Sequence, residues 1–276
     1  MRAPAGQIDK QAIPLNGLWS IVMNALPKND VTNVISFSGI DGAGKSTQIQ
    51  ALCTALKEDG RQVLLIRFWD DVAKLTQLRE TAGHTIFKGD KGVGTPSAPI
   101  NRRDKNVRSF LMTGVRLFIY FLDAISVRTE VSQAMRSNAD VVIFDRYIYD
   151  ELANLSLSNP AIRAYVWLIM KLVPRPDISF LLDADPVEAR ARKPEYPIEF
   201  LCTNRQSYLS LSDLIGGFAV IGPMPVQDVG RSVLSYARNE LSCIVLRQKS
   251  DARMTSCEDD KEEAKPERPQ TGPVSS

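Results

Sequence analysis

The sequence predicts an α/β protein built on a doubly wound, parallel, five-stranded sheet. Short apolar runs alternate with helical patterns along the chain, and the first run leads into a glycine-rich turn. Continuous apolar runs are typical of parallel strands buried on both faces, and strand–helix alternation favours right-handed crossovers. The five runs are VISFS (34–38), VLLIR (63–67), VVIF (141–144), ISFLL (178–182) and FAVI (218–221).

Helical periodicity fills the stretches between these runs. Gly60 ends the first helical pattern, and Pro174 and Pro176 end the third, because both residue types interrupt a helix. The patterns lie at about 45–58, 108–136, 161–172, 186–191 and 226–246.

Four segments define the expected domain organisation. One globular domain should cover residues 33–247, preceded by an N-terminal extension over 1–32. Residues 248–276 are charged and proline-rich, so we expect a disordered tail. Residues 70–107 mix glycine, proline and charge without a lasting period, which indicates either a functional flap or partial disorder. The extension should also contain an amphipathic helix, because apolar residues recur there at helical spacing: Leu15, Leu18, Trp19, Val22 and Leu26. This helix would pack on the domain or form an oligomer contact.

Composition excludes several classes of function. The net charge of +2 indicates neither a nucleic-acid partner nor an anionic membrane surface. Four dispersed cysteines suit a reducing cytosol better than a disulfide framework, and one histidine excludes a histidine-based zinc site. The sequence contains no apolar run of membrane-spanning length and no signal-peptide pattern. We therefore expect a cytoplasmic protein.

The glycine-rich turn is the most specific motif. Gly39, Gly44, Lys45 and Ser46 fill the template G-x-x-x-x-G-K-[ST], between an apolar strand and a helical pattern. Glycines let backbone N–H groups surround a phosphate, Lys45 would reach the β- and γ-phosphates of ATP, and Ser46 would hold Mg²⁺. The expected ATP-binding residues are Gly39, Ile40, Asp41, Gly42, Ala43, Gly44, Lys45, Ser46 and Thr47.

An acid and an arginine follow the third strand. The C-terminal ends of parallel strands face the ligand crevice, so Asp145 and Arg146 should lie beside the glycine loop. Asp145 would orient Mg²⁺, and Arg146 would hold an acceptor phosphate by bidentate contacts.

A third cluster follows the fourth strand. Asp185 is a good N-cap and Pro186 a good first helical residue, so a short helix should begin here. Arg190, Arg192 and Lys193 crowd its end just before Pro194. This arrangement is typical of a mobile lid that brings an arginine to a transferring phosphate.

These segments together resemble the thymidylate kinase family, the nucleoside-monophosphate kinases of P-loop type. FSGIDGAGKSTQ resembles its opening motif, and VVIFDRY is similar to its strand with Asp-Arg-Tyr. LLDADPVEARAR, followed by EFLCTNRQSYLSL, resembles its lid and post-lid helix. The resemblance covers roughly residues 33–246 and implies a P-loop NTPase fold, a lid at about 186–200 and a homodimer.

The resemblance also implies roles within the loop. The family's acid at the position of Asp41 contacts the acceptor sugar. The next position is arginine in one branch and glycine in the other, whose lid supplies the catalytic arginine. Gly42 therefore implies catalytic roles for Arg190 and Arg192, beside Lys45 and Arg146.

The acceptor side departs from the family pattern. Where the family has Arg-x-Pro-Gly-Gly-Thr, this chain has RFWDD at 67–71, in which Arg67 would keep the phosphate contact. The family's arginine on the preceding long helix would be replaced by Arg116 or Arg128. Two small hydroxyl residues and an Ala-Tyr-Gln segment in the family correspond here to Asp150, Glu151, Ala153, Asn154 and Leu155.

The leading hypothesis is a Mg²⁺-dependent transferase that moves the γ-phosphoryl of ATP to a nucleoside monophosphate, converting dTMP to dTDP in nucleotide biosynthesis. Alternatively, the acceptor is a nucleoside or another small metabolite, for which Asp70, Asp71 or Asp150 could act as a base. A third hypothesis is a non-catalytic ATP-binding module. Lys45, Ser46 and the lid cations argue against it, since a pure binder needs no arginines facing the γ-phosphate.

Overall fold

The computed structural model describes residues 32–72 and 110–263, and its centre is a parallel sheet of five strands in the order β2-β3-β1-β4-β5. The strands are β1 (Asn33–Ser38), β2 (Val63–Arg67), β3 (Val141–Asp145), β4 (Ile178–Leu182) and β5 (Phe218–Ile221). All five lie where the apolar runs predict them. The predicted α/β class and five-stranded parallel sheet are therefore confirmed.

Helices and one π-helical turn connect the strands. They are α2 (Lys45–Glu58), η2 (Phe68–Val72), α4 (Phe110–Ala134), α5 (Ile148–Leu152), α6 (Pro160–Leu172), α7 (Pro186–Arg192), α8 (Ile198–Ile215) and α9 (Val226–Glu263). Asn159 caps α6 by accepting the N–H of Ala161, and Asp185 caps α7 by accepting the N–H of Val187. In both helices a proline fills the first position, where its missing N–H costs no hydrogen bond.

Strand β1 forms the middle of the core. It pairs with β3 on one side and with β4 on the other, and all six of its residues are buried. Phe37 stacks on Phe180 of β4 with ring centroids 5.0 Å apart. Since β1 is fixed on both sides, the glycine loop that follows it starts from a rigid position.

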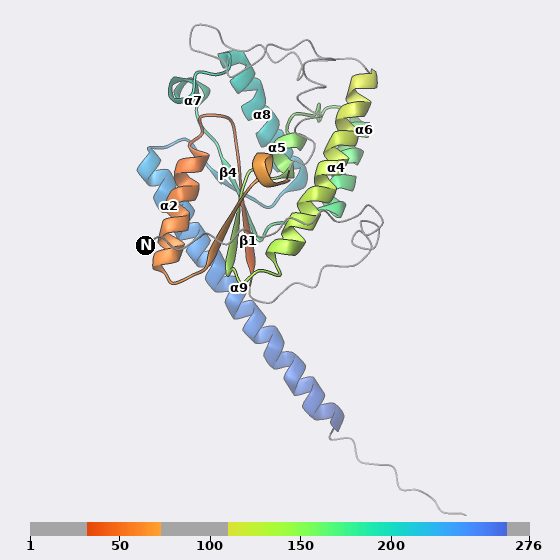
Figure 1. Ribbon diagram of the computed structural model, residues 1–276, viewed down its shortest axis with the longest axis vertical. Coiled ribbons are helices and arrows are strands. Elements are labelled where there is room, and N and C mark those ends of the chain that lie inside the picture. The colour runs from red at the N-terminus through yellow and green to blue at the C-terminus, as the bar shows by residue number, and fades with distance from the viewer. Residues whose placement is uncertain (1–31, 73–109, 264–276) are drawn as a thin grey trace, which may run out of the picture. The chain divides into compact units, whose positions relative to one another are not determined.

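Helices cover both faces of the sheet (Figure 1). The connection from β1 to β2 runs in one direction along the sheet, and the later connections run in the other. Right-handed crossovers therefore place α2 on one face and α4, α5, α6 and α8 on the opposite face. The C-terminal ends of all five strands, and the loops that follow them, meet at one edge.

Helix α8 lies where the resemblance places a post-lid helix, although periodicity did not mark it, because only a few of its 18 residues are buried. One expectation about the helices is corrected. The tail expected to be disordered from residue 248 begins as helix, since α9 continues to Glu263. Residues 248–263 contain no proline or glycine and many good helix formers, and the first proline comes at Pro266.

The chain divides into two compact units, Met1–Val233 and Leu234–Ser276. The boundary lies within α9, before the expected end of the domain at residue 247. None of the described helices is long and apolar enough to cross a membrane. The predicted N-terminal helix lies outside the described residues, as does the segment 73–109, which includes most of the expected flap.

Candidate active site

The glycine loop turns from β1 into α2 through backbone conformations that suit glycine. Gly39, Gly42 and Gly44 have φ values of 142°, 83° and 86°. A Cβ at Gly39 would lie 2.5 Å from the carbonyl oxygen of Leu182, so the loop passes directly over the end of β4. A Cβ at Gly42 would clash with the carbonyl of Ala189 in α7. Gly39 and Gly42 therefore require glycine for both conformation and space, whereas Gly44 requires it for conformation alone.

Lys45 is buried beneath this loop. Its Nζ donates to the carbonyl oxygens of Gly39 and Ile40, at 2.7 Å and 2.9 Å. Burial, followed by the charge of Arg146, lowers the pKa of Lys45 to about 8, against the attraction of Asp41. A cation is thus held against the inner surface of the loop.

Arg146 links the loop to the end of β3. Its backbone φ of 71° is unusual for a residue other than glycine. The turn that contains it follows directly after β3. One side of the guanidinium pairs with Asp41 in the loop, and Nη1 donates to Asp150 Oδ1 at 3.0 Å. Burial opposes the charge, but Asp150 and Asp41 together raise the pKa of Arg146 above its usual value.

Asp41 is part-exposed and ionises easily. Burial would raise its pKa, but the charges of Arg146 and Lys45 lower the pKa of Asp41 to about 2. Lys193, at the end of α7, contributes to the same effect. Asp41 therefore lies among three cations from different elements.

Asp150 connects Arg146 to the protein interior. Its Oδ1 accepts from Tyr208 of α8 at 2.8 Å as well as from Arg146. Its Oδ2 accepts from Ser38 Oγ at 2.8 Å and from the backbone N–H of Tyr147 at 3.3 Å. The sequence marked Asp150 only as a departure and a candidate base; no pattern pointed to Ser38 or Tyr208 as its partners.

Helix α7, the expected lid, lies against the loop. Ala189 contacts Gly42, while Arg192 donates to the backbone oxygen of Glu188 at 3.3 Å and approaches its carboxylate at 3.9 Å. Arg190 is half-buried on the same helix. The structure therefore brings α7 to the glycine loop, as the sequence predicts.

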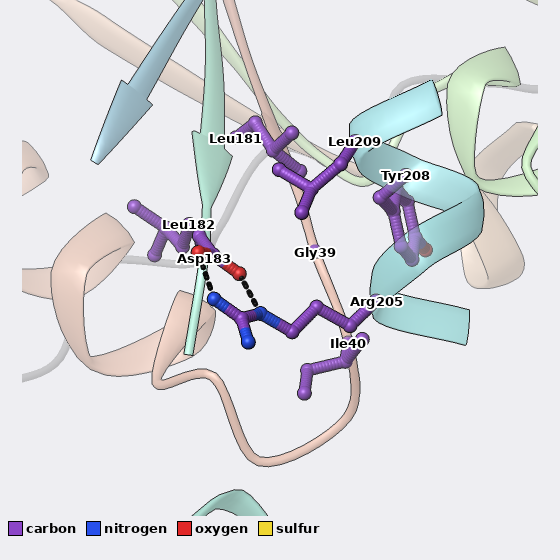
Figure 2. Close-up of a pocket in the computed structure, with 8 residues that line it drawn as sticks. All are labelled: Gly39, Ile40, Leu181, Leu182, Asp183, Arg205, Tyr208 and Leu209. Atoms are coloured by element: carbon purple, nitrogen blue, oxygen red, sulfur yellow. Dashed lines mark hydrogen bonds and ion pairs between the residues drawn. The ribbon is translucent and has the colours of Figure 1, made fainter. Parts of the chain in front are cut away.

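Two concave regions adjoin the loop. One is lined by Ala43, Gln48, Arg192, Met224 and Val226, among others, between the loop, α7 and the segment after β5. Figure 2 shows the other, behind the loop, where Arg205 of α8 faces Asp183 at the end of β4. Arg205 Nε and Nη2 donate to the two carboxylate oxygens at 2.6 Å and 2.7 Å. This bidentate pair, which the sequence did not predict, joins α8 to β4.

The remaining predicted residues are divided between the site and the rest of the fold. Arg67 and Asp145 end neighbouring strands in register, and Ser46 is exposed in the first turn of α2. Arg128 is directed elsewhere, because its Nη1 donates to the oxygen of Leu172 at the end of α6, at 3.1 Å. The expectation that Arg128 binds the acceptor is corrected.

Comparisons with known proteins find similar sequences among kinases. A thymidylate kinase of Chlorobium luteolum is 29% identical over 164 residues, which cover 58% of this chain and 66% of that protein. A probable thymidylate kinase of Methanosphaera stadtmanae is 27% identical over 215 residues, or 75% and 96% of the two chains. Another from Pyrococcus abyssi is 26% identical, with the same coverage. The chain is therefore similar in sequence to thymidylate kinases, at 26–29% identity.

This similarity agrees with the parallel sheet and with the position of the glycine loop at its C-terminal edge. No protein-family model matches the sequence.

Proposed function

We propose that this chain is a Mg²⁺-dependent kinase that transfers the γ-phosphoryl group of ATP to a nucleoside monophosphate, with dTMP as the acceptor, in the cytoplasm. One observation carries the proposal: the guanidinium of Arg146 lies between Asp41 of the glycine loop and Asp150. A cation that binds phosphate bidentately thus stands next to a loop suited to ATP. The relatives named thymidylate kinase support the same reaction.

The donor nucleotide would bind over the glycine loop. Backbone N–H groups and the N-terminus of α2 attract phosphate, and the buried Nζ of Lys45 can leave the carbonyls of Gly39 and Ile40 for phosphate oxygens. The concave region lined by Ala43, Arg192 and Met224 would receive the base of ATP, since it combines apolar atoms with a planar cation.

The acceptor would bind on the other side of Asp41. Arg146 would hold its phosphate, Asp41 would accept a sugar hydroxyl, and Arg67 would close the far side from the end of β2. An acceptor phosphate is already an anionic nucleophile, so transfer needs no general base. Alignment and charge neutralisation by Lys45 and the arginines of α7 would then supply most of the catalysis.

The donor set fits Mg²⁺. This ion usually takes one or two protein oxygens together with phosphate oxygens and water. Ser46, exposed at the start of α2, and Asp145, at the end of β3, offer such oxygens. No cluster of three or more acidic, histidine or cysteine ligands occurs among the described residues. When bound, Mg²⁺ neutralises phosphate charge.

The geometry of Asp150 counts against one form of the alternative reaction. A nucleoside acceptor would need a base to remove its hydroxyl proton. The carboxylate of Asp150 is buried and accepts from Arg146, Tyr208 and Ser38, so it is poorly placed for that work.

A screen of acceptors tests the proposal. ADP release would be measured with purified protein, ATP and Mg²⁺ against a panel of nucleoside monophosphates and nucleosides. We expect turnover with dTMP, and a loss of about 100-fold in kcat/KM for dTMP in Arg146→Lys at unchanged KM for ATP, because lysine lacks the bidentate geometry. Turnover on nucleosides but on no monophosphate would overturn the proposal. Light scattering would test for the expected homodimer.

A further inference from the structure

We propose that Asp150 is a positioning residue that holds the guanidinium of Arg146 for the acceptor phosphate and links it to α8, the helix after the lid. This inference rests on the proposed function. It follows from the different surroundings of the two carboxylates that flank Arg146.

The two carboxylates differ in exposure. The side chain of Asp41 retains 19% of its accessible surface, whereas that of Asp150 retains 1%. An incoming phosphate can therefore replace Asp41 at the guanidinium, because the displaced carboxylate of Asp41 can be solvated by water. The carboxylate of Asp150 is not accessible to water, so its hydrogen bond to Arg146 persists when the acceptor binds.

Asp150 is itself fixed from several directions. Ser38 of β1 and the backbone N–H of Tyr147 donate to Oδ2, at 2.8 Å and 3.3 Å, and Tyr208 of α8 donates to Oδ1 at 2.8 Å. A carboxylate bonded to a central strand, to the start of α5 and to α8 cannot rotate without breaking several hydrogen bonds. This makes it a firm support for an arginine whose own backbone has a φ of 71°.

The hydrogen bond from the Tyr208 hydroxyl connects Asp150 to α8, which contacts the expected lid helix α7. Helix α8 packs on α7, and the carbonyl of Ala189 in α7 lies where a Cβ of Gly42 would stand. A chain of contacts therefore runs from the loop through α7 and α8 to Tyr208, Asp150 and Arg146. A shift of α8 changes the hydrogen bond from Tyr208 and so the position of the guanidinium.

The first test compares Asp150→Asn with the wild-type protein. We expect kcat/KM for dTMP to fall by up to about 100-fold, mostly through KM for dTMP, since a displacement of about 1 Å has effects of this size. KM for ATP should change less than about twofold, because the contacts of Lys45 remain. Equal losses for ATP and dTMP, or no loss, would overturn the inference.

Two further variants separate positioning from stability. Tyr208→Phe should lower kcat/KM for dTMP by about 3- to 10-fold, the effect of one hydrogen bond, and should add little in the Asp150→Asn background. Asp177→Asn is the matched control, because Asp177 accepts from the backbone N–H of Val34 at 2.9 Å at the opposite edge of the sheet. Full additivity of the first two variants would remove the proposed link to α8.

A measurement without acceptor distinguishes this inference from the proposed function. The Nε–Hε signal of Arg146 in ¹⁵N-labelled protein, assigned by its loss in Arg146→Lys, reports how firmly the guanidinium is held. We expect a sharp signal in the wild-type protein and a broadened or shifted one in Asp150→Asn. If dTMP is not a substrate but this change occurs, the proposed acceptor is wrong and the positioning role stands. An unchanged signal would overturn the positioning role itself.

Discussion

The two halves of the candidate site are built in different ways. The donor half is a short stretch of backbone, residues 39–47, whose glycines and buried Lys45 lie within nine positions of one another. The acceptor half combines side chains from β1, the glycine loop, the end of β3, α5 and α8. The proposed phosphate site is thus formed by a local motif, whereas the proposed acceptor site depends on how distant elements pack.

The halves also differ in their electrostatics. Lys45 is a single buried cation whose charge is disfavoured by desolvation. Arg146 is a cation with a carboxylate on either side, and its charge is favoured. The donor half is therefore sensitive to pH and to backbone shape, while the acceptor half is sensitive to the loss of a charged partner.

The largest expected effect breaks the donor half. Lys45→Ala removes the ammonium that would contact the transferring phosphate, so the barrier should rise by about 3–5 kcal/mol, on the scale of an arginine finger. Steady-state kinetics would show the loss with every acceptor, while the melting temperature stays close to that of the wild-type protein. Unchanged phosphoryl transfer would contradict the role of Lys45.

The second-largest expected effect comes from changing the backbone conformation of the glycine loop at Gly42. Gly42→Ala combines a φ of 83° with a clash against the carbonyl of Ala189, so we expect a loss of about 2–5 kcal/mol in the free energy of unfolding. Gly60→Ala is the matched control, because its φ of 81° is similar but a Cβ there meets nothing within 4 Å. Urea denaturation would measure both, and equal losses would show that the contact with α7 is unimportant.

The charged partner of the acceptor half gives a smaller, pH-dependent effect. The pKa of Asp41 falls from 3.8 to about 2 on folding, so its charge stabilises the fold above about pH 4. Asp41→Asn should lower the free energy of unfolding by about 2 kcal/mol at pH 7. The difference between the two proteins should shrink as the pH falls through 2. A difference that stays constant down to pH 2 would argue against the ion pair with Arg146.

The smallest effect concerns protonation of Lys45. Its pKa of about 8 lies below the ordinary 10.5, so the ammonium loses its proton, and its attraction for phosphate, as the pH rises above 8. We expect kcat/KM for ATP to fall about tenfold for each further pH unit. Lys45→Arg, which stays charged, should show a flat profile at lower activity. A flat wild-type profile from pH 7 to 10 would contradict this view.

Sequence patterns predicted the elements of the sheet better than the long-range contacts of the site. The five strands are buried apolar runs, and their positions follow from local composition. Helix α8 was indicated by the resemblance to a post-lid helix but not by periodicity, because its few buried residues, Leu201, Tyr208 and Leu211, give a weak periodic signal. Arg128 was misassigned because its partner, the backbone oxygen of Leu172, is 44 positions away.

The sequence by itself determined the α/β class and the glycine loop with Lys45, because the apolar strands and the glycine-rich motif consist of residues that are neighbours in the chain. Its short motifs also indicated the similarity to thymidylate kinases. The tertiary structure alone decided that Asp150 holds Arg146 from the buried side and Asp41 from the open side. Hydrogen bonds between residues separated by 58 to 112 positions leave no pattern in a single sequence. An acidic or hydroxyl side chain at such a position looks the same in the sequence whether or not it forms this hydrogen bond.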